Sequence, residues 1–275
     1  MSANQPGQMP KLPIPGVKNL IAVGSGKGGV GKTTVAVNLA VALAALGHKT
    51  GLMDADVYGP NVPLMMGISA SPMAHGDRIQ PLEQYGVKLM SMGFLNPGDR
   101  PVIWRGPMLH SVIQQFLRNV DWGELDYLII DLPPGTGDVQ LSLIQTAPIS
   151  GAIVVTTPSD VSLEDARKAV HMFDQVKVPV LGIVENMSYL ICPHCSERID
   201  VFSTGGGRRT AEQMQVHFLG ELPLDPAVRV GGDSGKPVAM KESDNGVGFR
   251  ALAVAALGRL ERMGGPSAPS IDISD

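Results

Sequence analysis

A glycine-rich segment near the N-terminus, Gly26–Thr33 with the sequence GKGGVGKT, fits the phosphate-binding pattern G-x-x-x-x-G-K-[ST]. Glycines let the backbone turn its N–H groups toward phosphate oxygens, and the N-terminus of a following helix adds positive potential. Lys32 places a cation at the outer phosphates, and Thr33 offers a hydroxyl to Mg²⁺. A glycine-rich turn that binds nothing is the alternative, but the loop follows an apolar run and precedes a helical pattern, as a phosphate loop must. The residues expected to contact the ligand here are Gly26, Lys27, Gly28, Gly29, Val30, Gly31, Lys32, Thr33 and Thr34.

Carboxylates follow two other apolar runs of the chain. Asp131 comes directly after Tyr127–Ile130, which is the Walker B pattern that holds Mg²⁺ through water. Asp54 and Asp56 follow a second run, and the carboxyl ends of parallel strands converge on a ligand. The ordinary alternative for Asp54 and Asp56 is an acid in a turn or a helix cap. Gly135, four residues after Asp131, is placed to donate its backbone N–H to a γ-phosphate.

The two cysteines, Cys192 and Cys195, form a C-P-H-C knuckle. Two thiolates at this spacing can face one metal ion or cluster, but they cannot supply the usual four ligands alone. The chain has no second pair, so the missing ligands must come from another molecule, and a symmetric dimer would supply four thiolates around its axis. The motif's chemistry leaves Zn²⁺ and a [4Fe–4S] cluster equally open. A thioredoxin-like redox pair is disfavoured because the motif does not open a helix after an early strand.

The composition indicates a folded protein with many loops. Of 275 residues, 44% are hydrophobic, which supports a sizeable core, and 33 glycines and 22 prolines favour loops over long helical bundles. The net charge of −4 implies no broad nucleic-acid-binding surface. No apolar run approaches the roughly 20 residues of a membrane span, and the polar N-terminus lacks the apolar core of a secretory signal. We therefore expect a cytoplasmic protein without nucleic-acid or membrane partners.

Apolar runs alternate with helical patterns along the chain. Runs such as Leu20–Val23 and Ile153–Thr156 are continuously apolar, which is typical of parallel strands buried on both faces. The alternation predicts an α/β fold: a doubly wound, mostly parallel sheet with helices on both faces. The expected strands are 20–23, 50–53, 87–92, 127–130, 153–156, 180–184 and 218–222, and the expected helices are 32–46, 107–118, 139–145, 163–173, 205–215 and 246–262.

Three segments are expected from these patterns. Residues 1–17 form a flexible lead, residues 18–263 form the nucleotide-binding domain, and residues 264–275 form a flexible tail. An insertion at about residues 188–207 interrupts the alternation and carries both cysteines. The tail is rich in Ser and Pro and ends acidic, which disfavours membrane docking through a basic amphipathic helix.

Lys27 adds a second lysine inside the glycine loop and produces the deviant Walker A pattern K-G-G-x-G-K-[ST]. In this respect the chain resembles the MinD/ParA/nitrogenase-iron-protein class, in which ATP lies between two subunits that meet face to face. The resemblance implies that Lys27 reaches the partner's nucleotide and that Asp56 orients the attacking water, so that Lys27, Lys32 and Asp56 are catalytic. It also places Asn186 where the class reads adenine, with a strand-end turn role as the alternative. ATP is favoured over GTP because the guanine-reading N-K-x-D motif is absent.

Longer stretches over residues 18–263 resemble the Mrp/ApbC-type iron–sulfur cluster carrier ATPases. The resemblance implies that Cys192 and Cys195 hold a [4Fe–4S] cluster in a homodimer, which takes the cluster from donor proteins and passes it to apo-proteins. It favours the cluster over zinc and implies that nucleotide state and cluster lability are coupled. The matching stretches are MDADVYGP at 53–60, DLPPGTGD at 131–138, ENMS at 185–188, the cysteine pair, GGG at 205–207, LPLDP at 222–226 and GGDSG at 231–235.

Other classes of function share parts of this pattern. Positioning or regulatory ATPases of the MinD/ParA type have the same glycine loop, and a zinc-bridged dimer would use the same cysteines. Electron-transfer ATPases like the nitrogenase iron protein take their cluster ligands from cysteines far apart in sequence, whereas Cys192 and Cys195 are three residues apart. Metal and sulfide analysis separates these alternatives.

Overall fold

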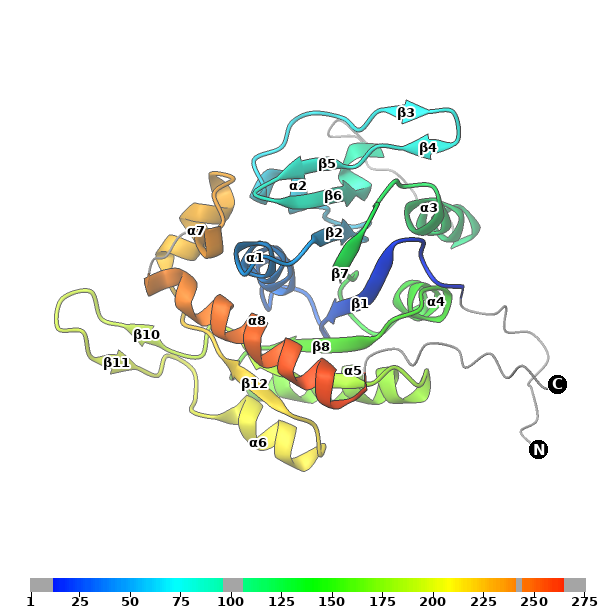
Figure 1. Ribbon diagram of the computed structural model, residues 1–275. Coiled ribbons are helices and arrows are strands. Elements are labelled where there is room, and N and C mark those ends of the chain that lie inside the picture. The colour runs from blue at the N-terminus through cyan, green and yellow to red at the C-terminus, as the bar shows by residue number, and fades with distance from the viewer. Residues whose placement is uncertain (1–11, 96–105, 241–243, 265–275) are drawn as a thin grey trace, which may run out of the picture.

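An eight-stranded sheet forms the centre of the computed structural model, which describes residues 12–95, 106–240 and 244–264 (Figure 1). The strand order is β12-β9-β8-β1-β7-β2-β6-β5. All neighbouring strands pair in parallel except the edge strand β5, which is antiparallel to β6. The strands of this sheet are β1 (Val17–Gly24), β2 (Thr50–Asp54), β5 (Leu82–Gln84), β6 (Val87–Ser91), β7 (Leu125–Asp131), β8 (Gly151–Thr156), β9 (Val180–Glu185) and β12 (Phe218–Glu221).

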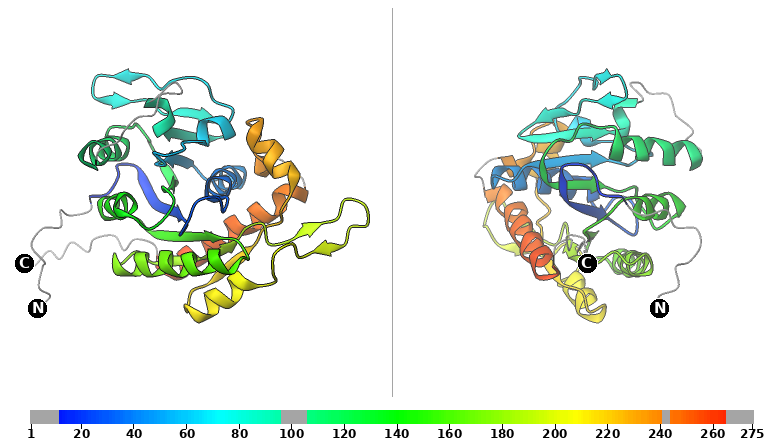
Figure 2. Two further views of the ribbon diagram at one scale, coloured as in Figure 1. Left: turned by 180° about the vertical axis from the view of Figure 1, so that it is seen from behind. Right: turned by 45° about the vertical axis from the view of Figure 1, so that its right-hand side comes forward.

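Helices cover both faces of the sheet, as the two turned views show (Figure 2). One apolar cluster joins the sheet to α3, α4 and α5, and the other joins it to α1, α2 and α8. The helices are α1 (Lys32–Ala45), α2 (Val62–Met65), α3 (Gly106–Arg118), α4 (Asp138–Thr146), α5 (Asp160–Gln175), α6 (Gly206–Gln213), α7 (Pro226–Asp233) and α8 (Asp244–Arg262). The prediction of a mostly parallel sheet between two helical layers is therefore confirmed.

The packing of β1 explains why its central run, Leu20–Val23, is continuously apolar. Leu20 and Ala22 lie in the cluster with α3, α4 and α5, whereas Ile21 and Val23 lie in the cluster with α1 and α8. Each of these four side chains is at most 2% exposed. Successive side chains of a strand point to opposite faces, so a run that is covered on both faces is apolar at every position.

Several short elements were not expected from the sequence. They include α2, α7, β5, the hairpins β3–β4 (Ala74–His75, Arg78–Ile79) and β10–β11 (Leu190–Ile191, Arg198–Ile199), and the 3₁₀ helices η1 (Met92–Leu95) and η2 (Val238–Met240). Elements this short show no hydrophobic periodicity over a useful window. The β10–β11 hairpin, which carries the cysteines, projects away from the sheet and its helices (Figures 1 and 2).

The ends of the chain are described only in part. Residues 1–11 of the expected lead and residues 265–275 of the expected tail lie outside the described residues. Within the lead, Ile14 is 4% exposed and packs into the core, and β1 begins at Val17. No helix of the described part of the chain is long and apolar enough to cross a membrane.

Candidate nucleotide site and cysteine hairpin

The glycine loop joins β1, a central strand of the sheet, to the N-terminus of α1. Gly29 and Gly31 both have a φ of 80°, which an L side chain rarely adopts. A Cβ atom on Gly31 would lie 2.2 Å from Nδ2 of Asn186, so this position also requires the absence of a side chain. Helix α1 has no side-chain cap, which leaves its first backbone N–H groups available for an anion.

Lys32, the first residue of α1, is buried among carboxylates. Its Nζ lies 2.6 Å from Oδ1 of Asp131 at the end of β7 and 3.8 Å from Oδ2 of Asp56. Asp54, at the end of β2, is opposite Asp131 in the parallel register. The structure thus brings the cation of the glycine loop and the three predicted acids to one edge of the sheet, as parallel strands require.

The interactions of Asp54 fix the loop after β2. Its Oδ1 accepts the backbone N–H of Asp56 at 3.1 Å, and its Oδ2 accepts the hydroxyl of Ser91 at 2.7 Å. Asp56 in turn accepts the N–H groups of Tyr58 at 3.0 Å and Gly59 at 3.3 Å. Ser91, which sequence analysis did not identify, ends β6 and is fully buried, so it positions Asp54 from the neighbouring strand.

The electrostatics of this edge favour a divalent cation. Burial, and next the charge of Asp131, raise the pKa of Asp54 to about 7. Burial also raises the pKa of Asp131, although Lys32 opposes that effect. The second oxygen of Asp131, Oδ2, is buried without a hydrogen-bond partner. Mg²⁺ prefers oxygen ligands. The three carboxylates outnumber the one buried lysine, and the unpaired Oδ2 of Asp131 is an oxygen available to such an ion.

Lys27 lies inside the glycine loop, and Gly135 lies on the neighbouring loop between β7 and α4. Gly135 has a φ of 92°, and its N–H donates to the carbonyl of Ser25 at 3.1 Å. Lys27 is partly exposed, and its carbonyl accepts the hydroxyl of Ser25 at 2.8 Å. Both residues therefore bond to Ser25, which directly precedes the glycine loop, and the N–H of Gly135 is occupied by the carbonyl of Ser25 in this structure.

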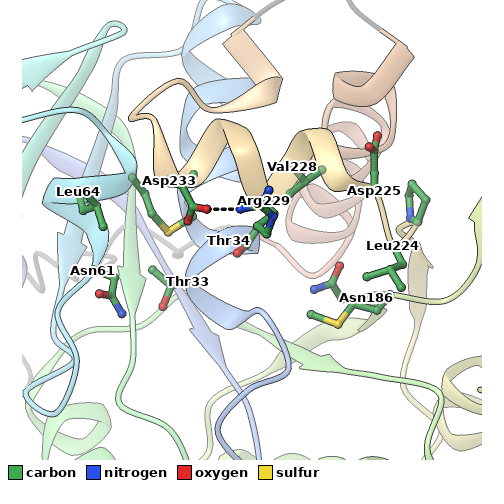
Figure 3. Close-up of a pocket in the computed structure, with 14 residues that line it drawn as sticks. Thr33, Thr34, Asn61, Leu64, Asn186, Leu224, Asp225, Val228, Arg229 and Asp233 are labelled. Carbon is green, nitrogen blue, oxygen red and sulfur yellow. Dashed lines mark hydrogen bonds and ion pairs between the residues drawn. The ribbon is translucent and has the colours of Figure 1, made fainter.

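A pocket of about 470 Å³ opens beside the glycine loop (Figure 3). Asn186 follows β9 and is 6% exposed, and its Nδ2 donates to the carbonyl of Val30 at 2.9 Å. Figure 3 shows Thr34 of α1 just below Arg229 of α7, and Asn186 to the right of both residues. The lining is Thr33, Thr34, Asn61, Leu64, Met65, Asn186, Met187, Pro223, Leu224, Asp225, Val228, Arg229, Gly232 and Asp233.

The size and lining of this pocket suit a nucleoside. Its walls come from α2, from the segment after β12 and from α7, none of which the sequence analysis recognised as pocket elements. A local signal for α7 was present: Asp225 caps the helix by accepting the N–H of Ala227 at 2.8 Å, and Pro226 follows it. Asp-Pro at a helix start is a recognisable signature.

The cysteine pair lies at the tip of the β10–β11 hairpin. Cys192 is partly exposed, Cys195 is exposed, and both are free thiols. The backbone N–H groups of Cys195 and His194 lower the pKa of Cys192, which favours the thiolate that binds metals. The described residues contain no group of three or more His, Cys, Asp or Glu side chains placed to hold a metal ion. Apolar side chains around the hairpin are also exposed, namely Ile191, Ile199, Val201 and Phe202.

Comparisons with known proteins agree with this geometry. A family model described as ParA, NUBPL iron-transfer P-loop NTPase, matches residues 16–256. The iron-sulfur cluster carrier protein of Synechocystis sp. is 52% identical over 245 residues, covering 87% of this chain and 69% of that protein.

Solved structures share the fold. A nucleotide-binding protein from Archaeoglobus fulgidus, in complex with ADP, has a TM-score of 0.74 and 38% identity over 85% of this chain and 92% of that chain. The cell division ATPase MinD of Pyrococcus furiosus has a TM-score of 0.65 and 25% identity over 90% of this chain and 99% of that chain. The MinD/ParA-like fold that the deviant glycine loop predicts is confirmed.

Proposed function

The chain belongs to the ParA/NUBPL family of iron-transfer P-loop NTPases, and from this premise we propose that it is an ATP-dependent carrier of [4Fe–4S] clusters. A homodimer holds the cluster between Cys192 and Cys195 of each copy and passes it from donor proteins to apo-proteins. The observation that carries this proposal is the exposed cysteine hairpin on the same chain as a complete phosphate-binding edge.

ATP binds with its phosphates on the glycine loop and its nucleoside in the pocket that contains Thr34 and Asn186. The N–H groups at the start of α1 and the ammonium of Lys32 bind the phosphates. Thr33 and, through water, Asp131 would hold Mg²⁺, which neutralises charge on the transferred phosphoryl group. The unpaired Oδ2 of Asp131 supports this assignment.

Hydrolysis requires a water molecule in line with the γ-phosphate. Asp56 has one oxygen fixed by Tyr58 and Gly59 and the other 3.8 Å from Lys32, so its carboxylate is held at the phosphate end of the site. There it orients the attacking water. Lys27 acts on the nucleotide of the partner subunit. When a γ-phosphate is present, the N–H of Gly135 donates to that phosphate instead of to the carbonyl of Ser25.

The hairpin provides the chemistry for cluster binding. Thiolates are the ligands of iron–sulfur clusters, and the lowered pKa of Cys192 favours that form. Two copies of the chain supply four thiolates. The exposed Ile191, Ile199 and Phe202 beside the thiols support contact with a second copy, because association covers exposed apolar surface.

The deciding experiment is anaerobic reconstitution, followed by iron, sulfide and zinc analysis and native mass spectrometry of the same sample. One cluster per dimer gives about two Fe and two sulfides per chain. About half a zinc per chain without sulfide would instead indicate a zinc-bridged dimer and a regulatory ATPase of the MinD/ParA type. Transfer to an apo-protein, measured with and without Mg·ATP, tests the dependence on ATP.

A further inference from the structure

Arg198 fastens the cysteine hairpin to the end of β12. Its two terminal nitrogens donate to the two carboxylate oxygens of Glu221 at 2.7 Å and 3.2 Å. Its Nε donates to Asp200 at 2.9 Å, and its guanidinium lies 4.1 Å from the centre of the Tyr189 ring. Arg198 therefore joins both arms of the hairpin to a strand of the central sheet. A guanidinium with two bonds to one carboxylate fixes direction as well as distance.

Ser188 connects Glu221 to a second, fully buried carboxylate. Its hydroxyl lies 3.0 Å from Oε2 of Glu221 and 2.6 Å from Oε1 of Glu185, the last residue of β9. The other oxygen of Glu185 accepts the N–H of Gly207 at the start of α6. One hydroxyl proton can serve only one carboxylate at a time. The Ser188 hydroxyl therefore has two alternative arrangements: it donates its proton either to Glu185 or to Glu221.

The same segment reaches the nucleotide pocket. Asn186 follows Glu185 directly, lines the pocket, and donates from its side chain to the carbonyl of Val30 in the glycine loop. The backbone N–H of Asn186 donates to Thr156 at 2.8 Å, so the segment is held from one side by β8. A contiguous set of contacts thus runs from Val30 through residues 185–188 and Glu221 to Arg198.

We propose that Arg198, acting through Glu221 and Ser188, is a positioning residue that sets the orientation of the cysteine hairpin according to the occupancy of the nucleotide pocket. A nucleoside beside Asn186 competes with the bond from Asn186 to Val30. A shift of the 185–188 segment then changes which carboxylate Ser188 serves, and Glu221 transmits the change to Arg198. This inference rests on the proposed function only for the roles of the pocket and the thiols.

The test uses metal-free, full-length protein and N-ethylmaleimide. Alkylation rates of Cys192 and Cys195 are followed by mass spectrometry without nucleotide, with Mg·ADP, and with Mg²⁺ and a non-hydrolysable ATP analogue. In the unmodified protein, nucleotide changes the rate by at least about threefold, within the range for networks that couple sites. In Arg198→Gln and Ser188→Ala, the rate no longer responds to nucleotide, while the affinity for Mg·ADP stays within about twofold.

Two further variants separate coupling from simple loss of hairpin structure. Asp200→Asn removes the negative charge that follows β11 but keeps the pairing of Arg198 with Glu221, so its nucleotide response should persist. Arg198→Lys keeps a charge for Glu221 and should restore part of the response. Three results would overturn the proposal. They are alkylation rates that do not change with nucleotide in the unmodified protein, a full nucleotide response in Arg198→Gln, and loss of the response in Asp200→Asn. No cluster is present in this assay, so failure of cluster binding would not affect it.

Discussion

At the scale of single residues, the site is defined by an imbalance of charge. Lys32 faces two acids, and a third, Asp54, is buried beside them. Lys32 compensates the buried charge of Asp131, which would be unpaired without it. The same ammonium lies at the start of α1, where the phosphates of the proposed nucleotide would bind.

Lys32→Ala is expected to lower ATP hydrolysis by about 100-fold or more, since in the proposed mechanism it removes the cation that stabilises the transferred phosphoryl group. The cysteine hairpin is separate from this residue in the fold, so iron binding after reconstitution should persist. Phosphate release and iron content measure the two effects. Lys168→Ala, which removes an exposed lysine paired with Asp165, is the control. Normal turnover in Lys32→Ala would show that the phosphate assignment is wrong.

The raised pKa of Asp54 predicts how the free protein responds to pH. The folded pKa of about 7 lies above the ordinary value of 3.8, so between these pH values the folded protein keeps a proton that the unfolded chain releases. The free energy of unfolding therefore falls as pH rises through this window, by at most about 4 kcal/mol from this group.

Asp54→Asn should flatten that pH dependence, because it mimics the protonated acid at every pH. Denaturant unfolding at several pH values between about 4 and 7 measures the effect. Asp77→Asn, at an exposed acid, is the control and should keep the wild-type slope. An equal slope in Asp54→Asn and in the unmodified protein would contradict the assignment.

At the scale of elements, the connection from β1 to α1 determines the geometry of the site. The loop must turn through positive φ at Gly31 while Asn186 packs against it, and α1 must begin without a side-chain cap. Both features keep backbone N–H groups pointed into the loop. A change that fills this space should affect nucleotide binding more than folding.

Gly31→Ala is expected to weaken Mg·ADP binding by about tenfold or more, because the new Cβ displaces Asn186 from the loop. Gly47→Ala provides a matched control. Gly47 has a φ of 90°, but a Cβ there meets no atom within 4 Å. Both variants should lose about 1–2 kcal/mol of stability from backbone strain, and only Gly31→Ala should lose affinity. Calorimetric titration and denaturant unfolding separate the two effects.

At the scale of the whole molecule, the β10–β11 hairpin projects away from the sheet and its helices (Figure 1). Exposed apolar residues accompany the two thiols on this segment. Each chain offers two thiols at this projection. Cluster binding and association of two copies are therefore a single event in the proposed carrier, and neither should persist fully without the other.

Cys192→Ser should lose the bound iron and, with it, the dimer that forms on reconstitution, because the shared cluster supplies the link between the copies. Affinity for Mg·ADP should be unchanged, since the pocket does not include the hairpin tip. Native mass spectrometry and iron analysis give both results. Ser196→Ala, which removes a hydroxyl from the same exposed turn, is the control and should retain the cluster. Unchanged iron in Cys192→Ser would contradict cluster binding between the hairpins.

The features of this protein that sequence patterns predict correctly lie in short, contiguous stretches. The glycine loop, the acid at the end of β7 and the C-x-x-C pair are local patterns, and continuous apolar runs indicate buried parallel strands whatever their order. Family resemblance then connected these parts to iron–sulfur cluster transfer. The order of the strands and the short elements between them left no comparable trace.

The distant residues that complete the site become apparent from the fold alone. Ser91 meets Asp54 across neighbouring strands, α7 lines the pocket beside α1, and Arg198 pairs with Glu221 from a segment 23 residues away. Such contacts depend on strand order and on the paths of loops, and a single hydroxyl, carboxylate or guanidinium carries no periodic signal in the sequence. Their partners are set by the packing of the whole sheet, because long-range contacts form only where it brings separate segments together.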